Sequence, residues 1–203
     1  MAKSTLLFAT GNQDKAKELR DIFPEFDIRT LKDVGFCEDI VEDGDTFEEN
    51  ALIKARAVCT FAEEKGIDCI VIADDTGLCV NALNGAPGIF SARYSGGGYA
   101  DNCAKLLSEM KDKTDRSAMF VCVAAMGHCG RFLTYRGEVP GKIAHEMLGT
   151  DGFGYDPVFI EDTTGLTYAQ MGEDEKNRIG HRKKAFEGIR PFILEELEDA
   201  KEK

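Results

Sequence analysis

The sequence predicts an α/β protein with a mixed, twisted sheet flanked by helices. Short apolar runs alternate with stretches of helical periodicity, and one pair of runs has the spacing of a hairpin. The alternation favours parallel strands between helices, and the hairpin adds an antiparallel pair. A chain of 203 residues suits one domain or two closely joined lobes, and we expect residues 1–203 to form a single domain.

The N-terminal half predicts two strands, each next to a helix. Thr5 to Ala9 reads as a buried strand, TGNQDK as a loop, and a helix face follows with Ala16, Leu19, Ile22 and Phe23. After the acidic loop EDIVEDGD, Thr46 and Glu49 have the form of a capping box, and Gly66 ends that helix. Cys69 to Ala73 reads as a strand buried on both faces, ending at Asp74 and Asp75.

The C-terminal half predicts a helix, a hairpin and further short elements. We expect a helix at 102–110, a hairpin of 118–126 with 131–139 joined by GHCG, and short strands at 156–160 and 166–171. The chain then returns to helix, which Pro191 should kink or restart.

Composition narrows the classes of function. With 25 basic and 37 acidic residues the net charge is −12, which disfavours non-specific binding to nucleic-acid polymers or anionic membranes. No apolar run approaches the ~20 residues of a membrane span, and MAKSTLLFAT does not have the form of a signal peptide, so we expect a cytoplasmic protein. Seven cysteines without a CxxC pair fit reduced, mostly buried thiols.

The aspartate pair in IVIADDTGL is a candidate metal site. Ligand sites in α/β sheets lie at the carboxyl ends of strands, where we expect Asp74 and Asp75, and carboxylate oxygens suit Mg²⁺. Adjacent strand residues point to opposite faces, but a turn starting here could aim both at one cleft. The alternative is that one aspartate merely caps a turn opened by Gly77.

Several other segments are individually ambiguous. TGNQDK, with Lys15, could bind phosphate between a strand and a helix start, or it could be a plain turn. Asn50 and Lys54 share one helix stripe, where Lys54 could serve a site or simply extend to solvent. The loop carrying Glu42, Asp43 and Asp45 could hold metal or be a solvated acidic stretch.

Two C-terminal motifs point towards a nucleotide. GTDGFGYDPVF could present Phe153 for stacking on a base, or Phe153 could fill the core. EDEKNRIGHRKKA is a basic cluster in an acidic protein, so it could capture phosphates or base edges, or it could be a solvated helix face. Taken together, the motifs contain the parts of a nucleoside triphosphate hydrolase.

The chain resembles the inosine triphosphate pyrophosphatase family, which hydrolyses noncanonical purine nucleoside triphosphates. The resemblance rests on FATGNQDKAKEL, TFEENALIKARA, IADDTGLCVNALNGAPGIFSARYSG, GTDGFGYDPVF and EDEKNRIGHRKKAF, which occur in the family's order and cover nearly the whole chain. It implies two lobes around a central nucleotide cleft, a Mg²⁺ cofactor, a homodimer, and hydrolysis of ITP, dITP or XTP to monophosphate and pyrophosphate.

The resemblance also assigns roles to particular residues. Glu42 and Asp75 would bind Mg²⁺, Asp75 would also accept a proton from water, Asp74 would support it, and Lys54 would neutralise phosphate charge. The implied substrate-binding residues are Thr10, Gly11, Asn12, Gln13, Asp14, Lys15, Thr76, Phe153, Gly154, Tyr155, Asp156, Lys176, His181 and Arg182.

Two other readings compete with this one. A haloacid-dehalogenase-type phosphatase also places aspartates after a buried strand, but its DxDxT spacing needs a residue between them that ADDT lacks. A nucleotide sensor that binds without hydrolysis could use the same pocket, yet it would not need Glu42, Asp74 and Asp75 together.

Overall fold

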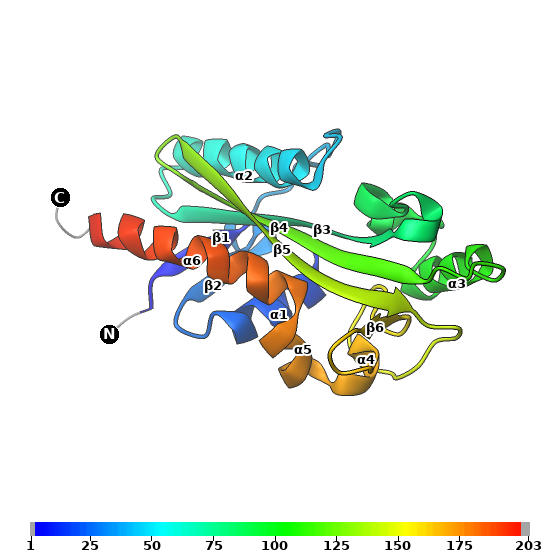
Figure 1. The fold of residues 1–203 in the computed structure, drawn as a ribbon. Helices are drawn as coiled ribbons and strands as arrows, with labels where there is room; N and C mark the ends of the chain where they lie inside the picture. Colours follow the sequence, from blue (N-terminus) through cyan, green and yellow to red (C-terminus); the bar gives the residue numbers. More distant parts are fainter. Residues whose placement is uncertain (1–2, 200–203) are drawn as a thin grey trace. The chain divides into compact units, whose positions relative to one another are not determined.

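The computed structural model describes residues 3–199, and these form six strands and six α-helices (Figure 1). The strands are β1 (Thr5–Phe8), β2 (Asp27–Thr30), β3 (Ile70–Val80), β4 (Ser117–His128), β5 (Arg131–Ile143) and β6 (Phe159–Glu161). The helices are α1 (Gln13–Ile22), α2 (Phe47–Glu64), α3 (Tyr99–Glu109), α4 (Tyr168–Met171), α5 (Glu173–Ile179) and α6 (His181–Asp199). Short 3₁₀ helices cover Leu31–Val34, Asn81–Leu83 and Gly88–Arg93. Within residues 3–199, no helix has both the length and the apolar character that a membrane span needs.

The strands form one mixed sheet in the order β2-β1-β3-β4-β5-β6. β1 pairs in parallel with β2 and with β3, and Phe8 lies opposite Ile72 in the second pair. β4 and β5 form the expected hairpin, and β6 pairs antiparallel to β5. The sequence therefore predicted the class of fold correctly.

The chain folds into two compact units. Unit 1 contains the residues up to Asp75, Cys122–Gly137 and the residues from Arg182, whereas unit 2 contains Thr76–Val121 and Glu138–His181. The boundaries fall inside β3, β4 and β5, so each of these long strands contributes residues to both units.

In unit 1, the sheet is covered on both faces. Leu6 and Phe8 of β1 and Ile70 and Ile72 of β3 pack in one cluster with apolar residues of α1 and α6. The intervening residues of these strands are also buried and point to the opposite face, where α2 lies (Figure 1). Burial on both faces explains why these strands read as continuous apolar runs.

In unit 2, a separate core forms around the C-terminal part of β3 and the N-terminal part of β4. Leu78 and Val80 of β3 and Phe120 of β4 pack with Leu106 of α3 and Tyr168 of α4. This core anchors the segments on either side of the GTDGFGYDPVF loop.

β3 differs from its predicted boundaries in a way that matters for function. It begins at Ile70 and continues to Val80, so Asp74 and Asp75 are interior strand residues and the alternative of a turn opened by Gly77 is wrong. The pairing explains the difference: β1 ends opposite Ile72, while β4 on the other side is twelve residues long. A local DDTG signal for a turn is overridden by that longer neighbour.

Other boundaries also needed correction. The segment predicted as a strand at 166–171 contains helix α4, because Thr167 and Gln170 form a capping box in which Gln170 Oε1 accepts from the amide of Thr167 at 3.0 Å. The strand expected at 156–160 begins only at Phe159, and β2 was not predicted. Pro191 lies within α6, so it does not restart the helix.

Candidate active site

Asp74 and Asp75 follow one another in β3, so their side chains leave opposite faces of the sheet. Asp74 contacts Lys15 and Arg182, whereas Asp75 contacts Asn50 and Lys54. Only 2% of Asp74 and 8% of Asp75 is exposed. Because β1 ends opposite Ile72, both carboxylates lie just past the carboxyl end of that parallel neighbour, where sites in α/β sheets form.

The Asp74 carboxylate belongs to a buried ionic network. Lys15 Nζ donates to its Oδ1 at 3.1 Å, while Arg182 donates from Nη2 and Nε to its Oδ2 at 3.1 and 3.3 Å. The same guanidinium donates from Nη1 to Glu18 of α1. The Cys122 thiol lies 3.7 Å from Oδ2 of Asp74. The network therefore ties α1, β3 and α6 together.

Arg182 is held entirely by protein groups. Its side chain is 1% exposed, and its guanidinium bonds to both Glu18 and Asp74. Burial acts to lower the pKa of Arg182, but the two carboxylates outweigh it and raise the pKa above its usual range. Arg182 therefore holds Asp74 in position. To contact a nucleotide directly, Arg182 would have to leave Glu18 and Asp74.

The Asp75 carboxylate faces a second cluster on the α2 side. Lys54 Nζ lies 3.4 Å from Oδ1 of Asp75 and also donates to Oε2 of Glu42. Asn50 donates to Oδ2 of Asp75 at 3.3 Å and accepts the amide of Gly44 at 2.9 Å. Asn50 and Lys54 are one helical turn apart, so both reach the same carboxylate. Lys54 is 8% exposed, which rules out the solvent-extended alternative.

The charges in this cluster perturb one another. Burial raises the pKa of Asp75, and the nearby Lys54 and Lys15 offset only part of that effect. Burial acts to lower the pKa of Lys54, but Asp75 and Glu42 outweigh it, so this pKa is raised and the ammonium stays charged. The cluster thus holds a fixed positive charge between two carboxylates.

The TGNQDK loop forms the start of α1. The side-chain oxygen of Asn12 accepts the amides of Asp14 and Lys15 at 2.9 and 3.2 Å, so Asn12 is the N-cap. Thr10 accepts the amide of Asn12 at 3.1 Å. Gly11, Gln13 and Asp14 are exposed at the positive end of the helix. The loop has the strand–turn–helix form expected for binding an anion.

In unit 2, Phe153, Asp156 and Lys176 form a compact group. Lys176 Nζ lies 2.6 Å from Oδ2 of Asp156 and 4.4 Å from the centre of the Phe153 ring. The same oxygen of Asp156 accepts the amide of Phe153 at 2.8 Å. Gly152 has a φ of +76°, and a Cβ there would meet this oxygen at 2.1 Å, so the tight loop requires glycine. Phe153 is half-buried, which disagrees with a core-filling role.

Two further residues of unit 2 have well-defined places. The His181 ring stacks on Phe120 with centroids 4.3 Å apart and planes 2° apart, and it is 2% exposed. Tyr155 lies in the unit 2 core, and its hydroxyl donates to the carbonyl of Ser91 at 2.9 Å. A substrate contact by Tyr155 would therefore use its backbone, as would one by Gly154. Thr76 follows Asp75 in β3 and is half-buried.

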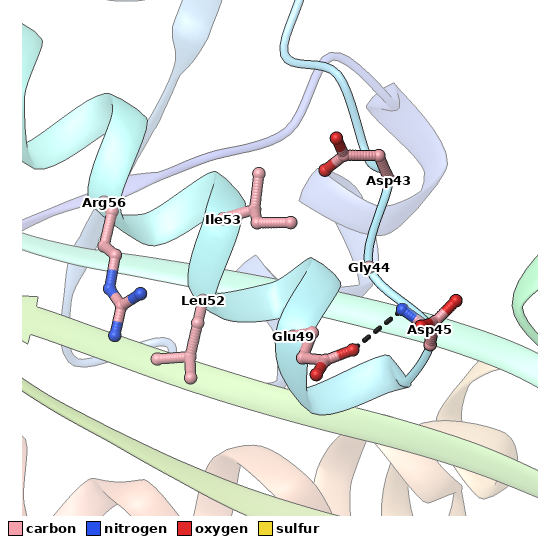
Figure 2. A pocket seen from close by; sticks show the side chains of 7 residues that line it. All are labelled: Asp43, Gly44, Asp45, Glu49, Leu52, Ile53 and Arg56. Carbon is pink, nitrogen blue, oxygen red and sulfur yellow. Dashed lines mark hydrogen bonds between the residues drawn. The ribbon is translucent and has the colours of Figure 1, made fainter.

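A pocket of about 290 Å³ lies beside the start of α2 (Figure 2). It is lined by Asp43, Gly44, Asp45, Glu49, Leu52, Ile53 and Arg56. Glu49 uses Oε2 to accept the amides of Asp45 and Thr46 at 2.7 and 3.1 Å, which completes the predicted capping box. Three carboxylates against one guanidinium disfavour an anionic ligand, so this pocket is unsuited to a triphosphate.

The structure adds residues that the sequence motifs did not single out. Glu18 lies on the buried stripe of α1 with Ala16 and Leu19, and a carboxylate at an apolar stripe position is the signal that could have revealed it. Phe120, which orients His181, lies in an apolar run with no distinguishing neighbour, so its role could not be read from sequence.

Comparisons with known proteins agree with this arrangement. The profile of the Ham1 family matches residues 6–192. A protein from Desulfotalea psychrophila named dITP/XTP pyrophosphatase is 46% identical, and the match covers 95% of this chain and 88% of that protein. One of the same name from Bacillus subtilis is 44% identical over 92% of this chain and 96% of its own.

Solved structures give the same result. The Ham1 protein of Staphylococcus aureus superposes with a TM-score of 0.82 at 38% identity, covering 95% of this chain and 100% of that one. A HAM1 protein from Coxiella burnetii gives a TM-score of 0.82 at 36% identity, covering 95% and 99%. Because the profile spans almost the whole chain and the relatives exceed 40% identity, this protein belongs to the Ham1 family.

Proposed function

We propose that this protein hydrolyses noncanonical purine nucleoside triphosphates (ITP, dITP and XTP) to the monophosphate and pyrophosphate. The observation that carries the proposal is the cluster at Asp75, where Asn50 and Lys54 contact the Asp75 carboxylate and Lys54 also contacts Glu42. Membership of a family whose relatives are named dITP/XTP pyrophosphatases supports the choice of substrate.

Mg²⁺ is the cofactor that this donor set fits. Glu42 and Asp75 both contact the Lys54 ammonium, so the two carboxylates lie close enough together to share one cation. Mg²⁺ commonly takes one or two protein carboxylates and completes its shell with waters and substrate phosphates. Glu42 and Asp75 would hold the ion, which would offset the charge that accumulates on the departing pyrophosphate.

The chain's own groups supply the remaining chemistry. Asp75 would orient the attacking water and accept its proton, while Asn50 fixes the carboxylate by donating to its other oxygen. Lys54 and Lys15 would neutralise phosphate charge, because both ammonium groups interact electrostatically with Asp75. Asp74, locked by Arg182, would keep Lys15 in place.

We assign recognition of the base to Phe153 and Lys176. Phe153 would stack on the purine, since its ring is half-buried and already faces the Lys176 ammonium. A 6-keto purine presents an acceptor where adenine presents an amino donor. Lys176 is bonded to Asp156 and would have to turn from that carboxylate to donate to the base; a donor at this edge would leave adenine's amino group unpaired and reject it.

The decisive experiment follows the products of ITP hydrolysis in H₂¹⁸O with Mg²⁺. Attack at the α-phosphorus gives unlabelled pyrophosphate and IMP that carries one ¹⁸O, which mass spectrometry detects. ITP and XTP should be consumed far faster than ATP, and chelation with EDTA should stop turnover. Release of orthophosphate would instead indicate a phosphatase, and tight binding without turnover would indicate a nucleotide sensor.

Two properties of the assembled protein complete the proposal. We expect free nucleotides to be the partners, with no nucleic-acid polymer bound, in keeping with the net charge of −12. We also expect the protein to be cytoplasmic and to form a homodimer. Light scattering coupled to size-exclusion chromatography would test the dimer directly.

A further inference from the structure

The hairpin between β4 and β5 carries a thiol in an unusual backbone position. Its loop consists of Cys129 and Gly130, with φ values of +46° and +74°. Positive φ at both central residues is the mark of a type I′ turn, which strongly favours Asn or Asp followed by Gly. A cysteine in the left-handed region costs about 1 kcal/mol, so its presence here calls for an explanation.

The neighbouring histidine, His128, supplies an explanation for this position of Cys129. Cys129 is exposed, and its Sγ lies 3.5 Å from Nε2 of His128. The other ring nitrogen, Nδ1, lies 2.8 Å from Oε2 of Glu196 in α6. A carboxylate only accepts hydrogen bonds, so Glu196 favours the tautomer with the proton on Nδ1, which leaves the Nε2 lone pair towards the thiol. Thiol, imidazole and carboxylate are thus arranged as in a nucleophile–base–orienter relay.

The surroundings hold this relay in place. Glu196 is fixed by Arg131, whose Nη1 donates to its Oε1 at 2.6 Å. Asp68 Oδ1 lies 3.7 Å from Nε2 of His128, where it would stabilise the imidazolium formed when the thiol gives up its proton. Together with Glu196, Asp68 makes the vicinity acidic and disfavours anionic reagents.

We propose that Cys129 is a nucleophilic thiol that forms mixed disulfides with uncharged or cationic low-molecular-weight disulfides, with His128 as its proton acceptor and Glu196 as the orienting group. The Cys129 thiolate attacks one sulfur of the small disulfide, so a new S–S bond forms as the old one breaks. The released thiolate takes up the proton held by His128, and the step needs no further oxidant. The site is separate from the Asp75 cluster, so it stands independently of the proposed function.

The mixed disulfide should persist once formed. The Cys59 thiol lies against Gly127, since a Cβ on that glycine would approach its Sγ to 2.7 Å. Burial, followed by the neighbouring Cys69, Glu63 and Cys129, raises the pKa of Cys59 to about 12. A thiol that remains protonated attacks disulfides poorly, so Cys59 should not displace the bound group.

The test compares two exposed thiols in the same wild-type protein. Cys37 is the matched reference, because it is exposed and its Sγ contacts the carbonyl of Gly35 rather than a histidine. With cystamine at pH 7, quenched and mapped by mass spectrometry, Cys129 should gain one cysteamine about tenfold faster than Cys37. The expected difference reflects proton transfer from the attacking Cys129 thiol to His128, a base that the Cys37 thiol does not contact.

Variants locate the cause of the difference. His128→Asn should bring the Cys129 rate down to that of Cys37, and Glu196→Gln should give an intermediate rate. Cys129→Ser should remove the fast phase without changing hydrolysis of ITP. Equal rates for the two thiols in the wild-type protein would overturn the proposal, and so would an unchanged Cys129 rate in a folded His128→Asn variant. The wild-type comparison remains decisive even if a variant folds poorly.

Discussion

Asp74 accepts hydrogen bonds from two fixed cations, Lys15 and Arg182, while Asp75 accepts from Lys54 and the amide of Asn50. Asp74 is therefore saturated by protein donors. Asp75 shares its cation with Glu42, which belongs to a different segment of the chain. This asymmetry supports our proposal that Asp75 takes the metal-binding and proton-accepting roles and that Asp74 has a positioning role.

Replacing Asp75 with asparagine should lower kcat for ITP by about 10²–10⁴-fold, because the amide is nearly isosteric but accepts no proton and binds Mg²⁺ weakly. The fold should survive, since Lys54 keeps Glu42 as a partner. Steady-state kinetics and a thermal melt check the two statements.

The control is Asp45→Asn, which alters an exposed carboxylate of the nearby loop that lines the separate acidic pocket. It should keep the wild-type rate. Near-normal turnover by Asp75→Asn would remove the basis for the assignment.

Phe153 should contribute binding energy rather than chemistry. Base–aromatic stacking is worth about 1–3 kcal/mol, so Phe153→Ala should raise KM for ITP between about fivefold and a hundredfold with a smaller effect on kcat. Phe192→Ala removes an exposed ring from α6 and should leave KM unchanged. A wild-type KM in Phe153→Ala would argue that the ring only supports the loop.

Sequence patterns singled out charged residues that meet in the structure, but they predicted few of the contacts between them. Asn50 and Lys54 share a helix stripe, and the structure brings both to Asp75. The link between Lys15 and Asp74 spans 59 residues, and that between Glu18 and Arg182 spans 164. No local pattern encodes such pairings, because they depend on how α1 and α6 dock on one face of the sheet.

At the scale of elements, local sequence signals predicted an element's boundary correctly where the residues that set the boundary are neighbours in sequence. The capping box at Thr46 placed the start of α2 correctly, since cap and helix are neighbours in sequence. The predicted end of β3 was wrong because a strand continues as far as its partners pair with it. Its partner β4 begins more than thirty residues later in the sequence. The correction moved Asp74 and Asp75 from one turn to opposite faces of the sheet.

The ion network that joins α1, β3 and α6 should matter for stability. Arg182→Met would leave Glu18 and Asp74 buried without their shared cation, which typically costs about 3–5 kcal/mol. For a chain of this size that corresponds to a fall in Tm of roughly 10 °C. Differential scanning calorimetry would measure the shift.

Arg178 offers the matched comparison, because it bonds to Glu175 one turn earlier at the surface of α5. Arg178→Met should change Tm by no more than a degree or two, as exposed pairs contribute little. Equal shifts in the two variants would show that the buried network adds no special stability.

At the scale of the whole molecule, the alternation of strands and helices correctly predicted a mixed sheet flanked by helices. It did not reveal where the two units divide, because the boundaries fall inside continuous strands. Asp75 and Thr76 are consecutive in β3 yet belong to different units. His181 and Arg182 are also consecutive in sequence and belong to different units. Such boundaries leave no linker of Gly, Pro or Ser to be recognised.

Each unit also contains a buried thiol that should make the protein sensitive to alkali. Burial is the main cause that raises the pKa of Cys59 in unit 1 to about 12 and that of Cys103 in unit 2 to about 11, from a usual value of 9.0. A folded-state pKa that is raised stabilises the protein below the unfolded value, and the contribution is lost as pH rises towards the folded value.

Between pH 9 and 11, each thiol should therefore remove about 1.4 kcal/mol of unfolding free energy per pH unit, because the unfolded chain releases its proton first. Urea unfolding at pH 8, 9.5 and 10.5 would measure the slope, with a Cys59→Ala/Cys103→Ala variant as the comparison. The variant starts less stable but should lose stability more gradually with pH. Parallel slopes in the two proteins would place the alkaline sensitivity elsewhere, first in Tyr94 and Tyr155, where burial also raises the pKa.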